Sequence, residues 1–188
     1  ALAQAAERAG YERVWYAEHH NMGMIASSAP AVLIAHIANH TSTIRLGTLV
    51  TSATFRLPGP LAVAVAQVDD MSAGRVELGL GAGWYQEEHE AYGIEFPPLG
   101  ERFDRLEEQL EIITGMWSTP LGETFESPGG RYPVTASPAL PKPAQSPVPI
   151  IIGGGGPKKT PALAARFAAE FNAPFVPRGF FTAQCDRV

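Results

Sequence analysis

The sequence predicts an α/β fold, and within that class an incomplete (β/α)8 barrel of the TIM type. Apolar, strand-like runs alternate with helical stretches along the whole chain. These runs are continuously apolar, which is typical of parallel strands that are covered on both faces. The helices are apolar on one side only, which suits the outer ring of a barrel, although a doubly wound sheet also satisfies the alternation. The predicted strands are too few to close a barrel, so we expect its first strand and its last βα units to be missing.

The first half of the chain predicts three strands separated by helices. An opening helix from Ala1 ends at Gly10, a residue type that commonly follows the last turn of a helix. Two further helices begin at prolines, which are common at the first helical position. In order after Gly10, we expect a strand over 13–17, a helix from Pro30, a strand over 44–50, a helix over 60–71 and a strand over 75–80.

The second half predicts one long helix, a proline-rich insertion and two further strands. Apolar residues recur at spacings of three and four from Phe103 to Trp117, with charged residues between them. The stretch 118–149 is too long for an ordinary connection, and its two adjacent glycines could turn a small hairpin. We place it at the end of the barrel away from the chemistry. Strands over 150–152 and 169–172 and a last helix near the C-terminus complete one barrel domain that spans 1–188.

Composition limits the partners of the chain. Its 188 residues are 45% hydrophobic and 18% charged, which is typical of a globular protein that can bury a core. A net charge of −5 argues against nucleic acid as a partner. No window reaches the ~18 uncharged apolar residues of a membrane span, and no signal peptide is visible. The single cysteine, Cys185, fits a reducing cytoplasm, and apolar outer helices are compatible with a homodimer.

Four consecutive glycines, Gly153–Gly156, give the strongest pointer to chemistry. They follow an apolar strand and lead into Lys158, Lys159 and Thr160, which we expect to cap the next helix. Backbone N–H groups without side chains in the way can wrap a phosphate, and a helix N-terminus adds a partial positive charge. The simpler interpretation is a tight turn that needs positive φ. A turn needs one or two glycines, so the run favours a phosphorylated ligand.

A second group of polar residues, Glu18, His19 and His20, follows the first predicted strand. In an α/β barrel the functional groups lie on loops after the carboxyl ends of strands. Adjacent histidines on extended chain point to opposite faces and no third ligand is suitably spaced, so we expect no metal. Proton transfer by His19, with Glu18 or another group setting its tautomer, is the functional interpretation. A structural histidine bonded to backbone is the alternative.

Alternate glycines mark the end of the third predicted strand. Gly79, Gly81 and Gly83 could let a flat ligand approach the backbone, with Trp84 and Tyr85 along its edge. A crowded barrel rim that excludes side chains explains the same pattern equally well.

Taken together, four stretches resemble the luciferase-like flavin-dependent monooxygenases: Ile44–Thr51, Gly74–Trp84, Gly100–Glu107 and Ile152–Gly156. The similarity covers nearly the whole chain, and from about residue 41 to 175 it is greatest to the subgroup that uses coenzyme F420. The front segment differs. Ala17–Met22 and Ala26–Pro30 resemble the FMN-using members of the bacterial luciferase type.

The resemblance implies a (β/α)8 barrel that binds reduced FMN or F420 and oxidises or reduces a small organic substrate. It implies proton transfer by His19 and a cis non-proline peptide bond within Val50–Thr51–Ser52 that supports the cofactor ring. The phosphate end of the cofactor is expected at Gly153, Gly154, Gly155 and Gly156, with Lys158 and Thr160, and Gly81 and Gly83 are expected near the ring. Luciferase-type members often have an arginine where Ala82 stands, which favours F420.

Two other functions fit the same residues. A phosphate-binding barrel of the isomerase or lyase kind would need an acid or a lysine on a strand inside the barrel, and Glu77 is the visible candidate. Alternatively, the chain has no activity of its own. Without the missing strands its sheet would have open edges and an exposed lumen.

Overall fold

The computed structural model describes residues 2–23, 27 and 29–188. Ala1 and two residues of the front segment, 26 and 28, lie outside the described residues, so the predictions made on them stay predictions. The elements are α1 (Leu2–Arg8), β1 (Arg13–Tyr16), α2 (Pro30–Ala38), β2 (Arg45–Thr48), β3 (Thr51–Ser52), α3 (Pro58–Met71), β4 (Val76–Gly81), α4 (Gln86–Ala91), α5 (Leu99–Ser118), β5 (Ile150–Gly153), α6 (Lys159–Phe167), β6 (Glu170–Asn172) and α7 (Arg178–Cys185). The predicted alternation of helices and strands is therefore confirmed.

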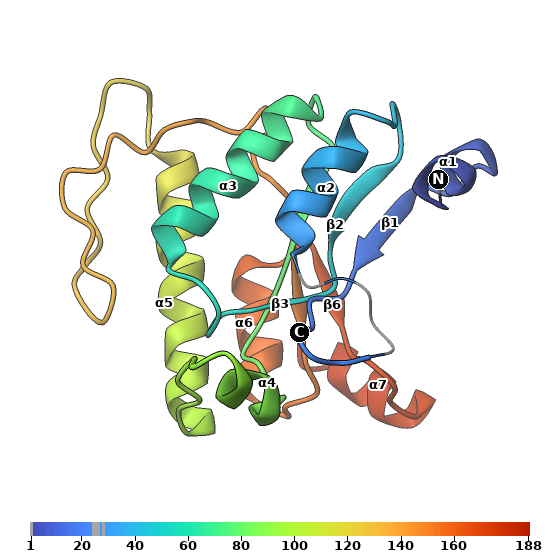
Figure 1. Cartoon of the computed structure of the whole chain (residues 1–188). Helices are drawn as coiled ribbons and strands as arrows, with labels where there is room; N and C mark the ends of the chain where they lie inside the picture. Colours follow the sequence, from blue (N-terminus) through green and yellow to red (C-terminus); the bar gives the residue numbers. More distant parts are fainter. Residues whose placement is uncertain (1, 24–26, 28) are drawn as a thin grey trace.

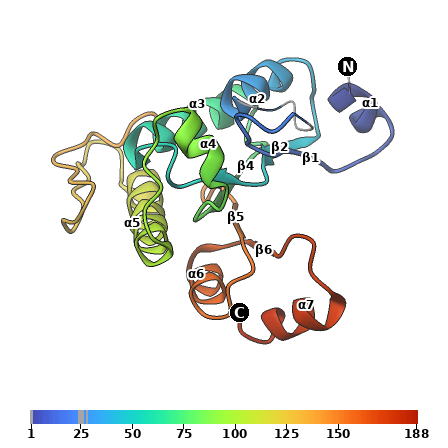
Figure 2. The ribbon, with the colours of Figure 1, turned by 60° about the horizontal axis from the view of Figure 1, so that its bottom comes forward.

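All of these strands run parallel in one curved sheet. Its order is β1-β2-β4-β5-β6, and the short β3 also pairs with β4. Helices α2, α3, α5 and α6 contact one another in sequence along one face of the sheet (Figure 1). In the second view the strands follow an arc, and these four helices lie on the outer side of it (Figure 2). The architecture is an incomplete α/β barrel, as predicted.

The core lies between the sheet and its helices. Strand residues Leu78, Leu80, Ile150 and Ile152 are almost fully buried against α5 and α6. Helix α5 has the apolar stripe that its sequence predicts, since Leu106, Leu110, Ile112, Ile113 and Met116 are all buried in the same cluster. Burial of such side chains is the main stabilising contribution to a fold of this kind. Among the described residues, no helix is both long and apolar enough to cross a membrane.

Two helices begin at different residues from those predicted. Helix α3 begins at Pro58 instead of Pro60, and both prolines fit within its first turn. Helix α6 begins at Lys159, so the prediction that Thr160 is its N-cap is wrong. Thr160 is already inside the helix, and its side chain turns towards the α-carbons of Gly154 and Gly156 instead of capping. The short strand β3 and helix α4 were not expected at all.

The proline-rich segment between α5 and β5 projects beyond the helical layer (Figure 1). Phe125 and Ser137 form an antiparallel bridge, and Ser127 N donates to Val134 O, so the predicted hairpin is present. Its tip folds back along α5, where Arg131 forms an ion pair of 2.5 Å with Glu101. Glu101 lies in the first turn of α5, so the tip is not confined to the far end of the barrel as we expected.

Glu7 attaches α1 to the chain that leads into β2. One oxygen of its carboxylate accepts hydrogen bonds from the amides of Ser42, Thr43 and Ile44 at 2.7 to 3.0 Å. These bonds, with the largest contribution from Thr43, lower the pKa of Glu7 from 4.5 to about 2. A lowered pKa means that the folded state binds this proton less tightly than the unfolded state does.

We therefore predict a pH-dependent effect of Glu7→Gln. The variant should be less stable than the wild type at pH 6, where the carboxylate is charged in both states. The difference should shrink as the pH falls from about 4.5 to about 2, because the wild type loses the same contribution over that range. Urea unfolding at several pH values measures this. A difference that stays constant over the range would contradict the assignment.

Candidate active site

The carboxyl ends of the strands bring together most of the predicted site residues. His19 and His20 follow β1, Val50 and Ser52 lie at β3, Trp84 and Tyr85 follow β4, and the glycine run follows β5. The sequence placed these groups correctly because the ends of parallel strands share one edge of the sheet.

Val50 is packed directly against the carboxyl ends of strands β4 and β5, the edge of the sheet that we call the rim. A cis peptide bond joins Leu49 to Val50, immediately before the segment in which the resemblance placed one. The methyl groups of Val50 lie 3.0 Å from the position that a Cβ would take at Gly79 and at Gly81, and 2.9 Å from that position at Gly153. A Cβ at Gly83 would collide with the hydroxyl of Ser52. These glycines are therefore explained by crowding within the chain, the second of the two interpretations that the sequence allowed.

His19 has an acidic partner that the sequence did not identify. Its Nδ1 lies 3.2 and 3.4 Å from the two carboxylate oxygens of Glu88, on α4. The same carboxylate accepts a hydrogen bond of 2.8 Å from the amide of His20. Glu88 is 3% exposed, and the rings of Trp84 and Tyr85 stand edge-on to His19 at 5.7 and 6.1 Å. Because Glu88 is buried and contacts both the His19 ring and the amide of His20, it can hold His19 in one orientation.

Glu18, which we named as one candidate for setting the tautomer of His19, is bonded to another residue. Its carboxylate forms a bidentate pair with Arg56, one bond measuring 2.7 Å, and lies 3.4 Å from Nε2 of His20. Neighbouring residues of an extended segment point to opposite sides, so Glu18 and His19 face different partners. Glu88 takes the place beside His19 instead. A sequence signal for it existed, because the acidic pair at 87–88 follows a strand end.

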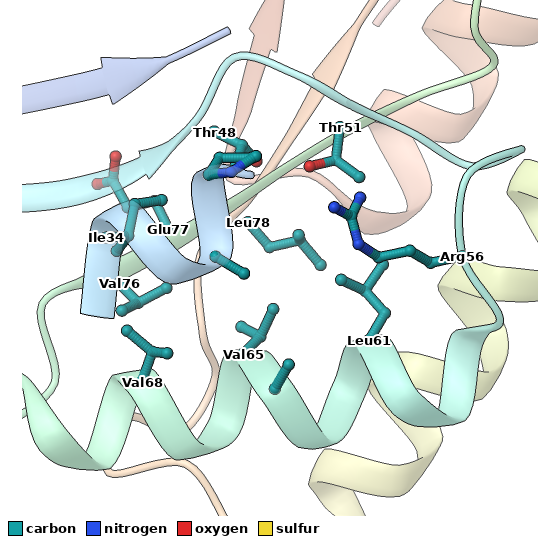
Figure 3. Close-up of a pocket in the computed structure, with 13 residues that line it drawn as sticks. Ile34, Thr48, Thr51, Arg56, Leu61, Val65, Val68, Val76, Glu77 and Leu78 are labelled. Carbon is teal, nitrogen blue, oxygen red and sulfur yellow. The ribbon is translucent and has the colours of Figure 1, made fainter. Parts of the chain in front are cut away.

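The side chain of Thr51 points away from the rim. With Ile34, Arg56 and Leu61 it lines a cavity of about 60 Å³ between the sheet and helices α2 and α3, and its hydroxyl lies near the Arg56 guanidinium (Figure 3). The side chains of Val50 and Ser52 lie on the opposite face, against the rim glycines. A direct contact from the side chain of Thr51 to a ligand at the rim is therefore not expected, and only its main chain could take part.

The glycine run forms an open turn before α6. The amide of Gly154 is already bonded to Asn172 O at 2.9 Å, so it is not available to a ligand. Gly155 and Lys158 are exposed, and a Cβ at Gly155 would meet nothing closer than 4.0 Å. The hydroxyl of Thr160 is buried at the base of the turn and, among the described residues, has no hydrogen-bond partner. An unsatisfied buried hydroxyl beside unobstructed main chain is the arrangement that a phosphate oxygen fits.

Lys159, the second lysine after the run, is directed elsewhere. Its ammonium group contacts Asp104 on α5 at 2.6 Å.

The carboxylate of Glu77 is also occupied, because it accepts hydrogen bonds from Trp15 Nε1 at 2.7 Å and from Arg45 Nε at 2.6 Å. It is therefore not free to act as the base of an isomerase. Within the described part of the chain, no group of three or more His, Cys, Asp or Glu residues could hold a metal ion.

The buried pair between Glu18 and Arg56 gives a stability prediction. Arg56→Met should lower the free energy of unfolding by about 3 kcal/mol, because a buried carboxylate then loses its partner. Adding Glu18→Gln should recover part of that loss. The matched control is Arg166→Met, which breaks exposed pairs with Glu107 and Glu111 and should cost less than about 1 kcal/mol. Equal effects of the two arginine variants in urea unfolding would contradict this prediction.

The rim gives a second stability prediction. Gly79→Ala should lower the free energy of unfolding by about 3 kcal/mol, or prevent folding, because the new Cβ would collide with Thr48 O. Gly59→Ala is the control, since nothing lies within 4 Å of its Cβ position in the first turn of α3. There the substitution should be neutral or slightly stabilising. Similar losses in both variants would show that crowding is not what requires glycine at this rim.

Comparison with known proteins adds the family context. A family described as "Luciferase-like monooxygenase" matches residues 1–184. The chain is 35% identical over 176 residues to an F420-dependent glucose-6-phosphate dehydrogenase of Nakamurella multipartita, covering 90% of this chain and 50% of that protein. It is 34% identical over 152 residues to the oxygenase component of a flavin-dependent trigonelline monooxygenase of Acinetobacter baylyi, covering 80% and 40%.

Solved structures give the same fold. A monooxygenase from Streptomyces bottropensis superposes with a TM-score of 0.84 at 24% identity, over 99% of this chain and 56% of that one. An F420-dependent secondary alcohol dehydrogenase in complex with an F420-acetone adduct gives 0.80 at 23%, over 98% and 59%. At such identities the likeness shows the fold alone. The chain spans about half the length of the curated relatives it matches.

Proposed function

The chain belongs to the luciferase-like monooxygenase family, and we propose that its strand ends hold reduced FMN or coenzyme F420 for the oxidation or reduction of a small organic substrate. The observation that carries this proposal is the rim itself. It combines the Val50 side chain packed against three glycines, a histidine paired with a buried acid, and an open glycine turn with a hydroxyl that is unsatisfied within the described part of the chain.

The residues present suit such a cofactor at both of its ends. The exposed main chain of Gly155, the half-buried main chain of Gly156, the hydroxyl of Thr160 and the ammonium group of Lys158 would hold the phosphate end. Val50 and Ser52 would lie against the ring, which needs a firm and largely apolar support. The bound cofactor would supply hydride transfer if it is F420, or oxygen activation if it is reduced FMN.

His19 is the proposed proton-transfer residue. Glu88, on its Nδ1 side, favours the tautomer in which Nδ1 carries the hydrogen, because a carboxylate accepts and does not donate. Nε2 is then the basic nitrogen of the neutral ring. Glu88 acts through His19 as a positioning residue, and the neighbouring rings of Trp84 and Tyr85 limit the access of water.

F420 is the better supported of the two cofactors. Ala82 is buried in the core cluster beneath the rim, so this position adds no cation for a phosphate there. Curated relatives named as F420-dependent dehydrogenases match 85 to 93% of the chain.

We also propose a cytoplasmic homodimer. Cys185 is exposed and free, which fits a reducing compartment. Leu57, Val32 and Val63 expose apolar side chains on and next to the outer helices α2 and α3, which fits contact with a second copy.

Cofactor titration tests the main proposal. The purified whole protein should bind reduced FMN or F420, followed by fluorescence or absorbance, and Gly155→Val should weaken the binding at least tenfold. A Cβ at this position would meet nothing closer than 4.0 Å, and the side chain lies where the phosphate is proposed, so a loss of binding in a variant with wild-type stability would report the ligand and not the fold. Gly59→Val, in the first turn of α3, is the control.

Two outcomes would contradict the proposal. If neither FMN nor F420 binds in either redox state, the chain does not have this function. If Gly155→Val binds as tightly as the wild type while remaining folded, the phosphate end does not lie at the glycine run.

A further inference from the structure

A chain of hydrogen bonds lies behind the rim and connects Ser52 to a buried histidine. Ser52 Oγ is 2.6 Å from Thr54 Oγ1, which is 2.6 Å from Nε2 of His89 on α4. The other ring nitrogen, Nδ1, is 2.7 Å from the carbonyl oxygen of Tyr85. None of these contacts is needed for proton transfer by His19, whose acid partner is Glu88.

The direction of these hydrogen bonds follows from the two ends of the histidine. A carbonyl oxygen only accepts, so Nδ1 of His89 must carry a hydrogen. In a neutral ring Nε2 is then an acceptor, and the hydroxyl of Thr54 donates to it. With its hydrogen used, Thr54 can only accept from Ser52. The hydroxyl of Ser52 therefore points inward, to Thr54.

His89 is fully buried among aromatic side chains. The ring is 0% exposed and lies between Phe55 and Phe96, with centroids 4.9 and 4.7 Å away. The charged and titratable groups nearby have other partners: Glu88 contacts His19, His20 packs against Phe55, and Arg102 lies over Phe96. A charged imidazolium would find no carboxylate partner among these described contacts, and burial of an unpaired charge is costly.

Ser52 itself faces the rim. Its hydroxyl oxygen lies against the α-carbon of Gly83, on the same face as the Val50 side chain, and a Cβ at Gly83 would collide with it. Apart from the bond to Thr54, the contact that this oxygen makes within the described part of the chain is a long one of 3.4 Å from the amide of Thr54. A hydroxyl that donates its hydrogen keeps acceptor capacity on its oxygen, and this oxygen lies on the same face as the Val50 side chain.

We propose that Thr54 and His89 are positioning residues that fix Ser52 as a hydrogen-bond acceptor towards the cofactor ring, so that Ser52 favours the reduced cofactor over the oxidised one. The inference rests on the proposed function. Reduction puts a hydrogen on N5 of a flavin, whereas in a deazaflavin, where carbon replaces N5, it puts one on N1; the nitrogen concerned changes from an acceptor into an N–H donor. Ser52 can face one of these two positions, so the effect is expected with the cofactor whose nitrogen lies there. An acceptor that cannot turn its own hydrogen outward pairs with the donor and is repelled by the unprotonated nitrogen.

The direction of the hydrogen bonds from Ser52 through Thr54 to His89 can be measured without any cofactor. Nitrogen-15 NMR of the whole wild-type protein at neutral pH should show His89 as the neutral tautomer with its hydrogen on Nδ1. Thr54→Val, which keeps the shape of the side chain but removes the hydroxyl, should shift the Nε2 signal because its donor is lost. Hydrogen on Nε2, or a doubly protonated ring, would overturn the proposal.

The effect on the ligand is measured as a ratio of affinities. The dissociation constants for the oxidised and reduced forms of FMN, and of F420, are compared in the wild type, Ser52→Ala and Thr54→Val. We expect the preference for the reduced form to fall about three- to tenfold in both variants, as loss of one hydrogen bond predicts. A merely structural role would weaken both forms equally and leave the ratio unchanged, which would overturn the proposal.

A matched threonine provides the control. Thr114, on α5, bonds to Leu110 O in its own helix, so Thr114→Val should leave the ratio at its wild-type value. If no redox form of either cofactor binds the wild type, the proposed function fails and the role of Ser52 falls with it. The NMR measurement still reports the direction of the hydrogen-bond chain, so the two failures can be told apart.

Discussion

The contact between Val50 and three glycine positions is the constraint on which the rest of the site depends. The side chain of Val50 occupies the space that a Cβ would take at Gly79, Gly81 and Gly153, so strands β4 and β5 meet around one residue. Close-packed interiors do not tolerate an added methyl group at such a position. The glycines thus let the chain place an apolar side chain at the carboxyl ends of the strands, with the Ser52 hydroxyl against Gly83 on the same face.

The polar groups near Val50 are arranged in pairs. Glu88 bonds to His19, Glu18 to Arg56, and His89 to Thr54, although all six residues lie near the same strand ends. Each buried acid has a cation or donors of its own, which is what burial of charge requires.

The sequence predicted the helices and strands better than it predicted which side chains contact one another. Apolar runs and proline or glycine boundaries were sufficient to place most strands and helices, and the rule of strand ends located the rim. The sequence left the partner of His19 open, as Glu18 or another group, and did not identify Glu88, because Glu88 is 69 positions away and only the fold of α4 brings it close. Thr160 was misassigned because its N-cap pattern is local, whereas its side chain is drawn beneath the glycine run by tertiary packing. Local patterns thus predict where a site lies, and long-range packing decides which atoms meet there.

The two ends of the proposed cofactor site share one support. Gly153 lies against Val50 at the ring end, and the next residue, Gly154, opens the turn at the phosphate end and is held by Asn172 of β6. A change at Gly153 would therefore disturb both ends at once, whereas Gly155 touches neither Val50 nor β6. The ring and phosphate contacts are separable only at Gly155 and beyond, where the main chain leaves the sheet. A loss of cofactor affinity can therefore be assigned to the phosphate end alone only when the substituted residue is Gly155 or a later residue of the turn.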